Sequence, residues 1–394
     1  METRMSTPDT PAGRAVLTLA HVIGMIDMVA LPLWVGALMQ HHRFPPAQAG
    51  LTVTLFMLGA LVASVISARL FNRLAHRLAT SCGFGLAAAS FALASYWPMA
   101  PESFAAVALC HASAGFGVGT ALSFTHGCIG RSANPHRMFG LVNAAMGLFA
   151  LLFLGIMPGW IAKGGSTFLF EIFAALMAFV ALVSFVAFPK VPRADTATAH
   201  ESSAQVPAAA RLLIGVVICL TLTQAMVFSF MERIGIAHGF GAEKVHGVLI
   251  VMGLVNLLPG LLAAWWQRRV SSVAVGAAGP IVQAALALTL SSSATFWPYA
   301  VASSLFVSVV IFTHTFLFGL MNRLDSTGRA AAATPAMTMA GSCIGPALGG
   351  VVVQTAGYAG LGAVACAMAL LAVALMSQVR SQMRHRATLA GAQA

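Results

Sequence analysis

One acidic residue, Asp27, lies in the middle of an apolar stretch that is long enough, with its flanks, to cross a bilayer. A carboxylate near the bilayer centre costs about 2.5–3.5 kcal/mol on insertion scales. Such a group is retained when it is neutral, faces a cavity or has a partner, and no Lys or Arg is expected at a similar depth. Asp27 is therefore a candidate to bind a proton or a solute. The alternative is an acid hydrogen-bonded inside a helix bundle with only a structural role.

Trp34 and His111 could act together with such an acid. Trp34 follows Asp27 by seven residues, so both lie on one helix face. An acid and an aromatic ring on one face suit a cationic or amphipathic solute, although Trp34 could instead be an aromatic residue at the membrane boundary. His111 could gain and lose a proton near neutral pH or be a neutral histidine hydrogen-bonded to a neighbouring helix. His21 is expected to serve the cytoplasmic end of its span.

Other polar side chains fall in apolar segments of the second half of the chain. Most are expected only to bond one helix to another. The candidates to line a substrate cavity are Gln224, Asn256 and His314. Glu232 and Arg233, near the outer end of a span, are candidates for an outer gate with Lys244 or Glu243, or are a solvated helix end.

The composition excludes a water-soluble protein. The chain is 59% hydrophobic and 8% charged, whereas soluble domains carry about 25% charged residues. Apolar runs of about 20 residues predict membrane-spanning helices, so the fold class is an all-α integral membrane protein. The net charge of +11 does not indicate nucleic acid, because the basic residues are spread over short loops. Six cysteines without a close pair imply neither a disulfide framework nor a metal site.

Twelve spans can be placed, joined mostly by short loops. With the N-terminus inside, seventeen of the 21 Lys and Arg residues fall on the inner side and only Arg43, Lys163, Arg233 and Lys244 on the outer side. Both termini are therefore predicted to be cytoplasmic, in a plasma membrane of the bacterial inner-membrane type. The predicted spans are 15–39, 48–69, 78–97, 103–126, 138–161, 167–188, 212–236, 245–266, 271–292, 296–321, 330–353 and 358–379.

A polar, Pro-containing stretch divides the spans into two sets of six. Residues 189–211 read as a flexible cytoplasmic linker between an N-terminal six-helix bundle, 1–188, and a C-terminal six-helix bundle with a short basic tail, 212–394. The two halves carry similar basic loops and small-residue motifs at corresponding places, as duplicated transporters do.

At this point the chain resembles the major facilitator superfamily over essentially its whole length. Residues 68–77 are similar to the loop motif G-x-L-a-D-r-x-G-r-r, with Arg73 and Arg77 matching and Asn72 in place of the acid. In the family that acid pairs with nearby cations to lock one conformation, so the resemblance implies an altered lock here.

Two further motifs strengthen the resemblance. Residues 341–350 are similar to the antiporter-type motif g-x-x-x-G-P-x-x-G-G, but in the eleventh span rather than the fifth. Residues 111–119 are similar to R-x-x-x-G-x-G-x-G, with His111 where the family has an Arg linked to proton transfer. Residues 27–32 resemble the first span of drug:proton antiporters. The resemblance implies gating roles for Arg73 and Arg77. Gly345, Pro346 and Gly349 suit a gating helix, and ordinary close packing of helices is the alternative.

Together these features predict a proton-coupled secondary transporter that exports a small neutral, amphipathic or cationic compound by alternating access, with Asp27 and His111 coupling protons. Phosphate-binding loops and hydrolase motifs are absent, so no enzyme activity and no cofactor are expected. The expected partners are protons, a small-molecule substrate and lipid, and the expected state is a monomer. The alternatives are an importer, symporter or uniporter of a metabolite or chelate, and a membrane sensor or assembly protein without transport.

Overall fold

The computed structural model describes residues 7–190, 207–324 and 334–392, and every regular element among them is a helix. The chain divides into two compact units, Met1–Glu201 (unit 1) and Ser202–Ala394 (unit 2). The division falls inside the stretch 189–211 that the sequence predicts as a linker, of which residues 191–206 lie outside the described residues. Each unit is described below by itself.

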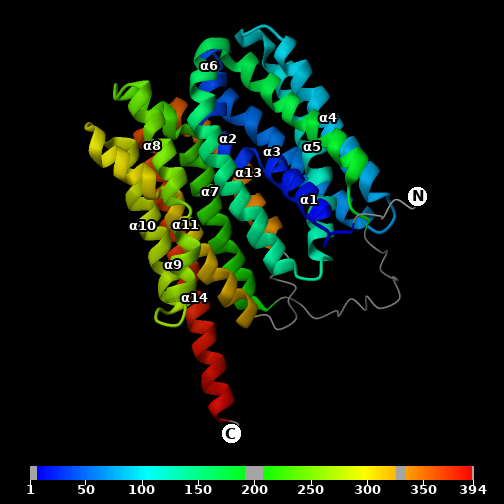
Figure 1. The fold of residues 1–394 in the computed structure, drawn as a ribbon. Helices are drawn as coiled ribbons and strands as arrows, with labels where there is room; N and C mark the ends of the chain where they lie inside the picture. Colours follow the sequence, from blue (N-terminus) through cyan, green and yellow to red (C-terminus); the bar gives the residue numbers. More distant parts are fainter. Residues whose placement is uncertain (1–6, 191–206, 325–333, 393–394) are drawn as a thin grey trace. The chain divides into compact units, whose positions relative to one another are not determined.

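Unit 1 contains the helices that carry Asp27, Trp34 and His111. Several of its helices begin at or next to a proline, which has no N–H to lose at the first helical position. Side chains cap two of them: Thr10 Oγ1 accepts from the Gly13 N–H, and Asn134 Oδ1 accepts from the Arg137 N–H. The helices are α1 (Pro11–Gly24), α2 (Asp27–Gln40), α3 (Pro46–Leu70), α4 (His76–Tyr96), the 3₁₀ turn η1 (Pro101–Ser103), α5 (Phe104–Gly130) and α6 (Pro135–Ala187) (Figure 1).

Helix α6 is two membrane spans joined by a reversal. At 1.5 Å per residue, the 51 apolar residues Arg137–Ala187 would extend about 77 Å, more than twice the bilayer core. Gly165 lies at φ 68°, ψ −159°, a conformation that essentially only glycine adopts, and Figure 1 shows the chain turning back on itself within α6. The described residues hold eleven helical stretches able to cross a membrane. Counting the two arms of α6 separately confirms the twelve predicted spans.

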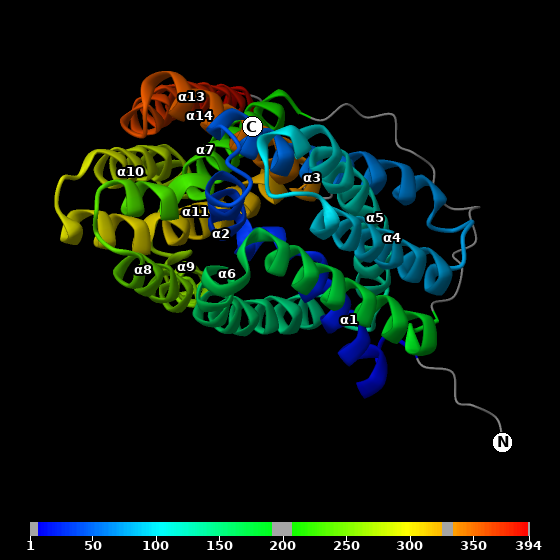
Figure 2. The same ribbon diagram turned by 90° about the horizontal axis from the view of Figure 1, so that it is seen from above.

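Glycines allow the helices of unit 1 to pack closely. A Cβ at Gly115 or Gly119 of α5 would collide with the α3 backbone at Phe56 or Ala60, and a Cβ at Gly117 would collide with α4 at Gly83. The three alternating glycines of the motif in the fourth span therefore bring α5 against two neighbours at once. Figure 2 shows α3, α4 and α5 side by side.

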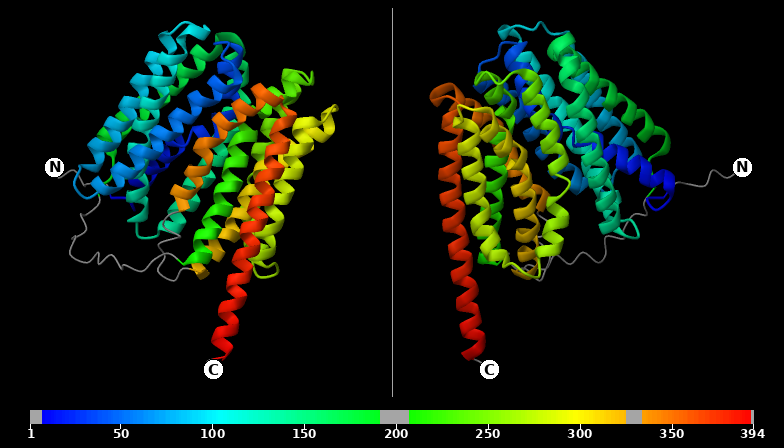
Figure 3. Two further views of the ribbon diagram at one scale, coloured as in Figure 1. Left: turned by 180° about the vertical axis from the view of Figure 1, so that it is seen from behind. Right: turned by 60° about the vertical axis from the view of Figure 1, so that its left-hand side comes forward.

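Unit 2 is also a bundle of helices packed around a buried apolar core. Its core includes Leu213, Leu220, Leu317 and Met376, which are almost fully buried. Figure 3 shows α14 continuing past the other helices of unit 2, consistent with its 34 residues and a length of about 51 Å. The helices are α7 (Ala208–Ala237), α8 (Ala242–Val255), α9 (Pro259–Trp266), α10 (Ser272–Ser292), α11 (Phe296–Leu324), α13 (Thr334–Ala356) and α14 (Ala359–Ala392).

Candidate functional site

The first membrane span is broken immediately before Asp27. Residues 11–40 form one apolar span, but α1 ends at Gly24 and α2 begins at Asp27. At the break the backbone makes hydrogen bonds between residues three apart, as in a 3₁₀ turn. They run from Ile26 N to Ile23 O (3.3 Å) and from Met28 N to Met25 O (3.1 Å). One turn further on, Pro32 has no N–H to donate to the Met28 carbonyl, which loosens the start of α2.

This break gives Asp27 an unusual environment near the middle of its span. Asp27 is half-buried and is the first residue of α2. The backbone N–H groups of Asp27 and Met28 at the start of α2 favour its charged form, and the positive end of the α2 dipole does the same. No ion pair joins Asp27 to another described residue. Burial opposes the charged form while the helix start favours it, so its charge is set by a balance of two effects.

Trp34 and His111 form one buried hydrogen-bonded pair in unit 1. The Trp34 indole Nε1–H donates to His111 Nε2 over 3.0 Å, and His111 Nδ1 lies 2.7 Å from the Val107 carbonyl of its own helix. The second contact fixes the proton on Nδ1 and leaves Nε2 as the acceptor. Both side chains are fully buried, and the rings of Phe56, Phe91 and Phe173 surround Trp34. Trp34 is therefore a core residue of unit 1 rather than a boundary aromatic.

A second histidine pair joins α1 to α5. His21 Nδ1 lies 2.9 Å from His126 Nε2, a distance that requires one ring to donate and the other to accept. His21 is 5% exposed, so this contact is buried between the two helices. Sequence reasoning missed His126, since its partner is 105 residues away and no local pattern relates them.

Unit 2 contains a second interrupted span. Helix α8 ends at Val255 and α9 begins at Pro259, and Asn256 caps the end of α8 within the interruption. Ser308 of α11 donates to Asn256 Oδ1 over 2.6 Å. The break therefore presents a polar side chain midway along a predicted membrane span, which is the kind of feature that lines transport sites.

Gln224 and His314 have unused hydrogen-bonding capacity. Gln224 is half-buried midway along α7, and its amide makes no hydrogen bond to any described residue. His314 stacks on Phe318 with 5.3 Å between ring centroids, and its shielded Nε2 has no partner in the described part of the chain. By contrast, the buried Gln283 amide donates to the Leu220 carbonyl over 3.0 Å and so has a structural contact.

The substituted loop motif keeps a hydrogen bond where the family has a charge pair. Arg131, at the end of α5, donates through Nη2 to Asn72 Oδ1 over 2.7 Å, and its guanidinium lies 4.7 Å from the centroid of the Phe71 ring. Arg73 is exposed, and Arg77 lies 4.9 Å from the Phe185 ring centroid. The neutral Asn72 thus replaces an ion pair with a hydrogen bond to a charged donor.

The predicted outer gate has a partner that the sequence did not suggest. Glu232 Oε1 accepts from His246 Nε2 over 2.9 Å, which links α7 to α8. Lys244 instead lies over the Phe296 ring, 5.6 Å from its centroid. Arg233, the residue after Glu232, is half-buried and makes other interactions.

The antiporter-type motif forms the contact between α13 and α7. A Cβ at Gly341 would collide with Thr221, and one at Gly345 would lie 2.7 Å from Met226 N and 2.9 Å from Leu222 O. A Cβ at Gly349 would lie 2.9 Å from Met226 O. The three glycines are four residues apart and form one stripe, so their immediate role is close helix packing. Pro346 lies inside this helix.

The sequence matches the family model of the Major Facilitator Superfamily over residues 16–334. The chain belongs to this superfamily. It is therefore a multi-pass membrane protein of a transporter family, and no enzyme family is found. No curated protein matches its sequence.

Solved structures of other major facilitator transporters share the fold. A D-xylose–proton symporter is 14% identical with a TM-score of 0.70, covering 93% of this chain and 96% of its own. The nucleoside transporter NupG is 15% identical with a TM-score of 0.71, covering 95% and 99%. The human organic anion transporter MFSD10 is 16% identical with a TM-score of 0.65, covering 93% and 100%. At these low identities the TM-scores show a shared fold alone, and the three different substrates show that the fold does not determine the cargo.

Proposed function

We propose that this major facilitator protein is a proton-coupled exporter of a small neutral, amphipathic or cationic compound. The observation that carries the proposal is the position of Asp27: a half-buried carboxylate at a helix break midway along the first span, without a cation paired to it among the described residues. An unpaired acid at this depth is retained at a cost, and proton or solute binding supplies a reason to retain it.

The polar groups available in the spans support a neutral or cationic substrate. Asp27 is negative or neutral, and Gln224, Asn256 and His314 add amide and imidazole groups that serve as donors or acceptors. No Lys or Arg lies midway along a predicted span, so an anionic solute would have no fixed counter-charge there. We therefore expect the substrate to be recognised by one carboxylate and several neutral hydrogen-bonding groups.

Asp27 would couple the two fluxes by holding either a proton or the solute. When a cationic or donor-bearing solute approaches, the ionised carboxylate attracts it, and the proton must leave. When the solute departs on the other side, the half-buried carboxylate regains a proton and its desolvation cost falls. Alternating access would then carry the proton inward and the solute outward.

A proton-release measurement tests this coupling. Purified protein in weakly buffered detergent with a pH indicator is mixed with tetraphenylphosphonium, ethidium and a series of neutral amphipathic compounds. We expect at least one compound to release protons from the wild type and none from the Asp27→Asn variant. Glu102→Gln, which removes an exposed acid in the turn η1, is the matched control and should release protons normally.

Binding of a compound without proton release, equal in wild type and Asp27→Asn, would contradict the assignment of Asp27. Direction is tested separately in inside-out membrane vesicles with an acidic interior. An exporter accumulates the compound in these vesicles under the proton gradient, and Asp27→Asn should abolish that accumulation. Gradient-driven uptake only into right-side-out vesicles with an acidic exterior would instead identify an importer.

A further inference from the structure

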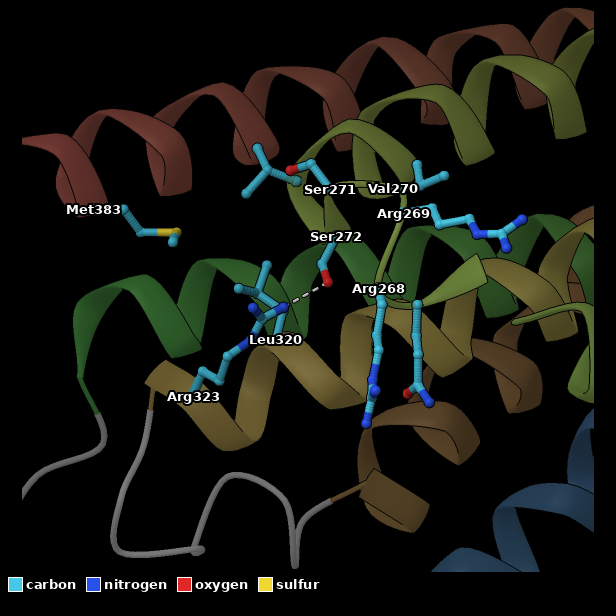
Figure 4. A pocket seen from close by; sticks show the side chains of 10 residues that line it. Arg268, Arg269, Val270, Ser271, Ser272, Leu320, Arg323 and Met383 are labelled. Carbon is cyan, nitrogen blue, oxygen red and sulfur yellow. Dashed lines mark hydrogen bonds between the residues drawn. The ribbon is translucent and has the colours of Figure 1, made fainter. Parts of the chain in front are cut away.

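A basic cavity lies in unit 2 where α9, α10, α11 and α14 come together. Its volume is about 360 Å³. It is lined by the connection between α9 and α10 together with side chains from the ends of α11 and α14 (Figure 4). The polar residues of its lining are Gln267, Arg268, Arg269, Ser271, Ser272 and Arg323, and none of the described lining residues is acidic.

Two of the arginines lie on either side of Ser272. Arg323 Nη2 donates to Ser272 Oγ over 2.6 Å, which holds the guanidinium against the wall of the cavity. Figure 4 shows Arg268 on the other side of Ser272, while Arg269 extends away from both. Arg269 lies over the Trp265 ring, 4.7 Å from its centroid. Arg268 and Arg323 are therefore the two arginines of the lining that do not lie over an aromatic ring in the described part of the chain.

The start of α10 adds backbone donors to these guanidinium groups. The N–H groups of Ser272 and Val273 have no acceptor within the helix because they belong to its first turn. The preceding residue, Ser271, does not cap them with its side chain. The positive end of the dipole of this 21-residue helix thus opens into a cavity that is also lined by the guanidinium groups of Arg268 and Arg323.

The corresponding cavity in unit 1 is built differently. It has a volume of about 370 Å³ and is lined by one arginine, Arg131. That guanidinium already donates to Asn72 and stacks on Phe71. The several arginines therefore distinguish the unit 2 cavity from the unit 1 cavity, although both cavities lie beside the corresponding basic loops of the two halves.

We propose that the unit 2 cavity binds a phosphate-bearing anion, which is either the headgroup of an anionic phospholipid or free phosphate. Guanidinium groups and helix N-termini are the donors that recognise phosphate oxygens in proteins. The adjacent surface of α9 suits the lipid source, because Leu261 and Trp265 are 72% and 60% exposed. Exposed tryptophan next to arginine is typical of the boundary where headgroups lie.

The test uses thermal unfolding of the full-length, delipidated protein in a nonionic detergent. Short-chain phosphatidylglycerol, short-chain phosphatidylcholine and inorganic phosphate are titrated separately at low ionic strength, since salt screens exposed charges. We expect phosphatidylglycerol to raise the midpoint temperature saturably and phosphatidylcholine to have a much smaller effect. The Arg268→Gln/Arg323→Gln double variant should bind at least about tenfold more weakly, because charged hydrogen bonds to the phosphate are lost.

Arg69→Gln, which removes one exposed positive charge from α3 in unit 1, is the control and should bind as the wild type does. Arg323→Lys, which keeps the charge, should retain part of the affinity. If the double variant does not fold, Arg268→Gln alone serves the same comparison, since Arg268 makes no hydrogen bond to a described residue. A response to inorganic phosphate as well as lipid supports a phosphate site, and a response to lipid alone assigns the headgroup. Equal responses to the two lipids without any to phosphate, or undiminished binding by the variants, would overturn the proposal.

Discussion

The pair formed by Trp34 and His111 shows how context decides the role of a titratable residue. His111 stands where the family has an arginine, and its imidazole alone would permit proton transfer. In unit 1, however, both ring nitrogens are engaged, Nε2 by Trp34 and Nδ1 by the Val107 carbonyl. Protonation at Nε2 would break the bond to Trp34 in a fully buried site, so we expect His111 to act as a positioning residue in this conformation.

Replacing Trp34 by phenylalanine tests this role. The variant removes the donor to His111 Nε2 and leaves a buried acceptor unpaired, which costs about 1–3 kcal/mol. We expect a lower unfolding temperature than for Trp97→Phe, the control at a 41% exposed tryptophan. The pH dependence of transport should be unchanged, whereas a shifted profile in Trp34→Phe would indicate that His111 does carry protons.

His42 makes the stability of unit 1 sensitive to acid. Its ring lies in the connection after α2, is 1% exposed and stacks on Phe170. Burial, with a smaller contribution from His41, lowers the pKa of His42 from 6.5 to about 4. The unfolded chain binds a proton at this residue below about pH 6.5 and the folded chain only near pH 4, so its contribution to stability falls as the pH drops through that interval.

The measurement is the midpoint of thermal unfolding at pH 7 and pH 5. We expect the midpoint of wild type to fall more over this interval than that of His42→Asn, which has no imidazole to protonate. His385→Asn, at an exposed position of α14, should behave as wild type does. An equal fall in wild type and His42→Asn would show that His42 does not contribute to acid sensitivity.

The residue scale is also where sequence reasoning was least complete. The position of Asp27 within an apolar span could be predicted because it depends only on the residues around it in the sequence. The enclosure of Trp34, the pairing of His21 with His126 and the bond between Glu232 and His246 depend on which helices pack together, and no periodicity encodes that. Trp34 and His111, for example, are 77 residues apart.

At the scale of the helix, glycine stripes determine the closest contacts. The stripe that resembles an antiporter motif packs α13 onto α7, and the alternating glycines of α5 do the same for α3 and α4. The sequence located both motifs but left open whether they serve packing or gating. The short distances from these glycines to the neighbouring helices favour packing as their first role. A close contact between small residues would also let one helix move along another during gating.

Gly345→Ala tests the closeness of the α13–α7 contact. The new Cβ would lie 2.7 Å from Met226 N and 2.9 Å from Leu222 O, and backbone atoms cannot yield as a flexible side chain does. We expect a loss of about 1–3 kcal/mol of stability, as overpacked sites show. Gly319→Ala in α11 is the control, since its Cβ meets nothing within 4 Å and alanine favours a helix by about 0.5–1 kcal/mol. Normal stability with impaired transport in Gly345→Ala would favour gating over packing.

The breaks in the first and eighth spans were not predictable from apolar length. A hydropathy pattern shows only that a segment is long enough to cross the bilayer, and both interrupted segments satisfy that criterion. Pro32 and Pro259 indicate where a helix ladder is weakened. The observed interruptions lie several residues before Pro32 and immediately before Pro259, so proline alone does not give the position of a break.

At the scale of the whole molecule, the distribution of charge predicts which side each loop faces. Seventeen of the 21 Lys and Arg residues fall on one side if α6 crosses the membrane twice. If α6 crossed only once, the loops after it would change sides and the basic residues would be divided between both faces. The reversal at Gly165 therefore determines the topology of the entire second half.

Reporter fusions at four positions test this topology. A fluorescent protein that matures only in the cytoplasm should fluoresce when fused after residue 134, after residue 190 or at the C-terminus, and should be dark after Lys163. Alkaline phosphatase, which is active only outside, should give the opposite pattern at the same four positions. We expect this result because both arms of α6 are apolar enough to span the membrane. The turn between them holds only one cation, Lys163, which is too little positive charge to keep that turn in the cytoplasm. Phosphatase activity after residue 190 would mean that α6 crosses once, and it would place the linker and the C-terminus on the opposite side from the one inferred here, while the N-terminus would stay inside.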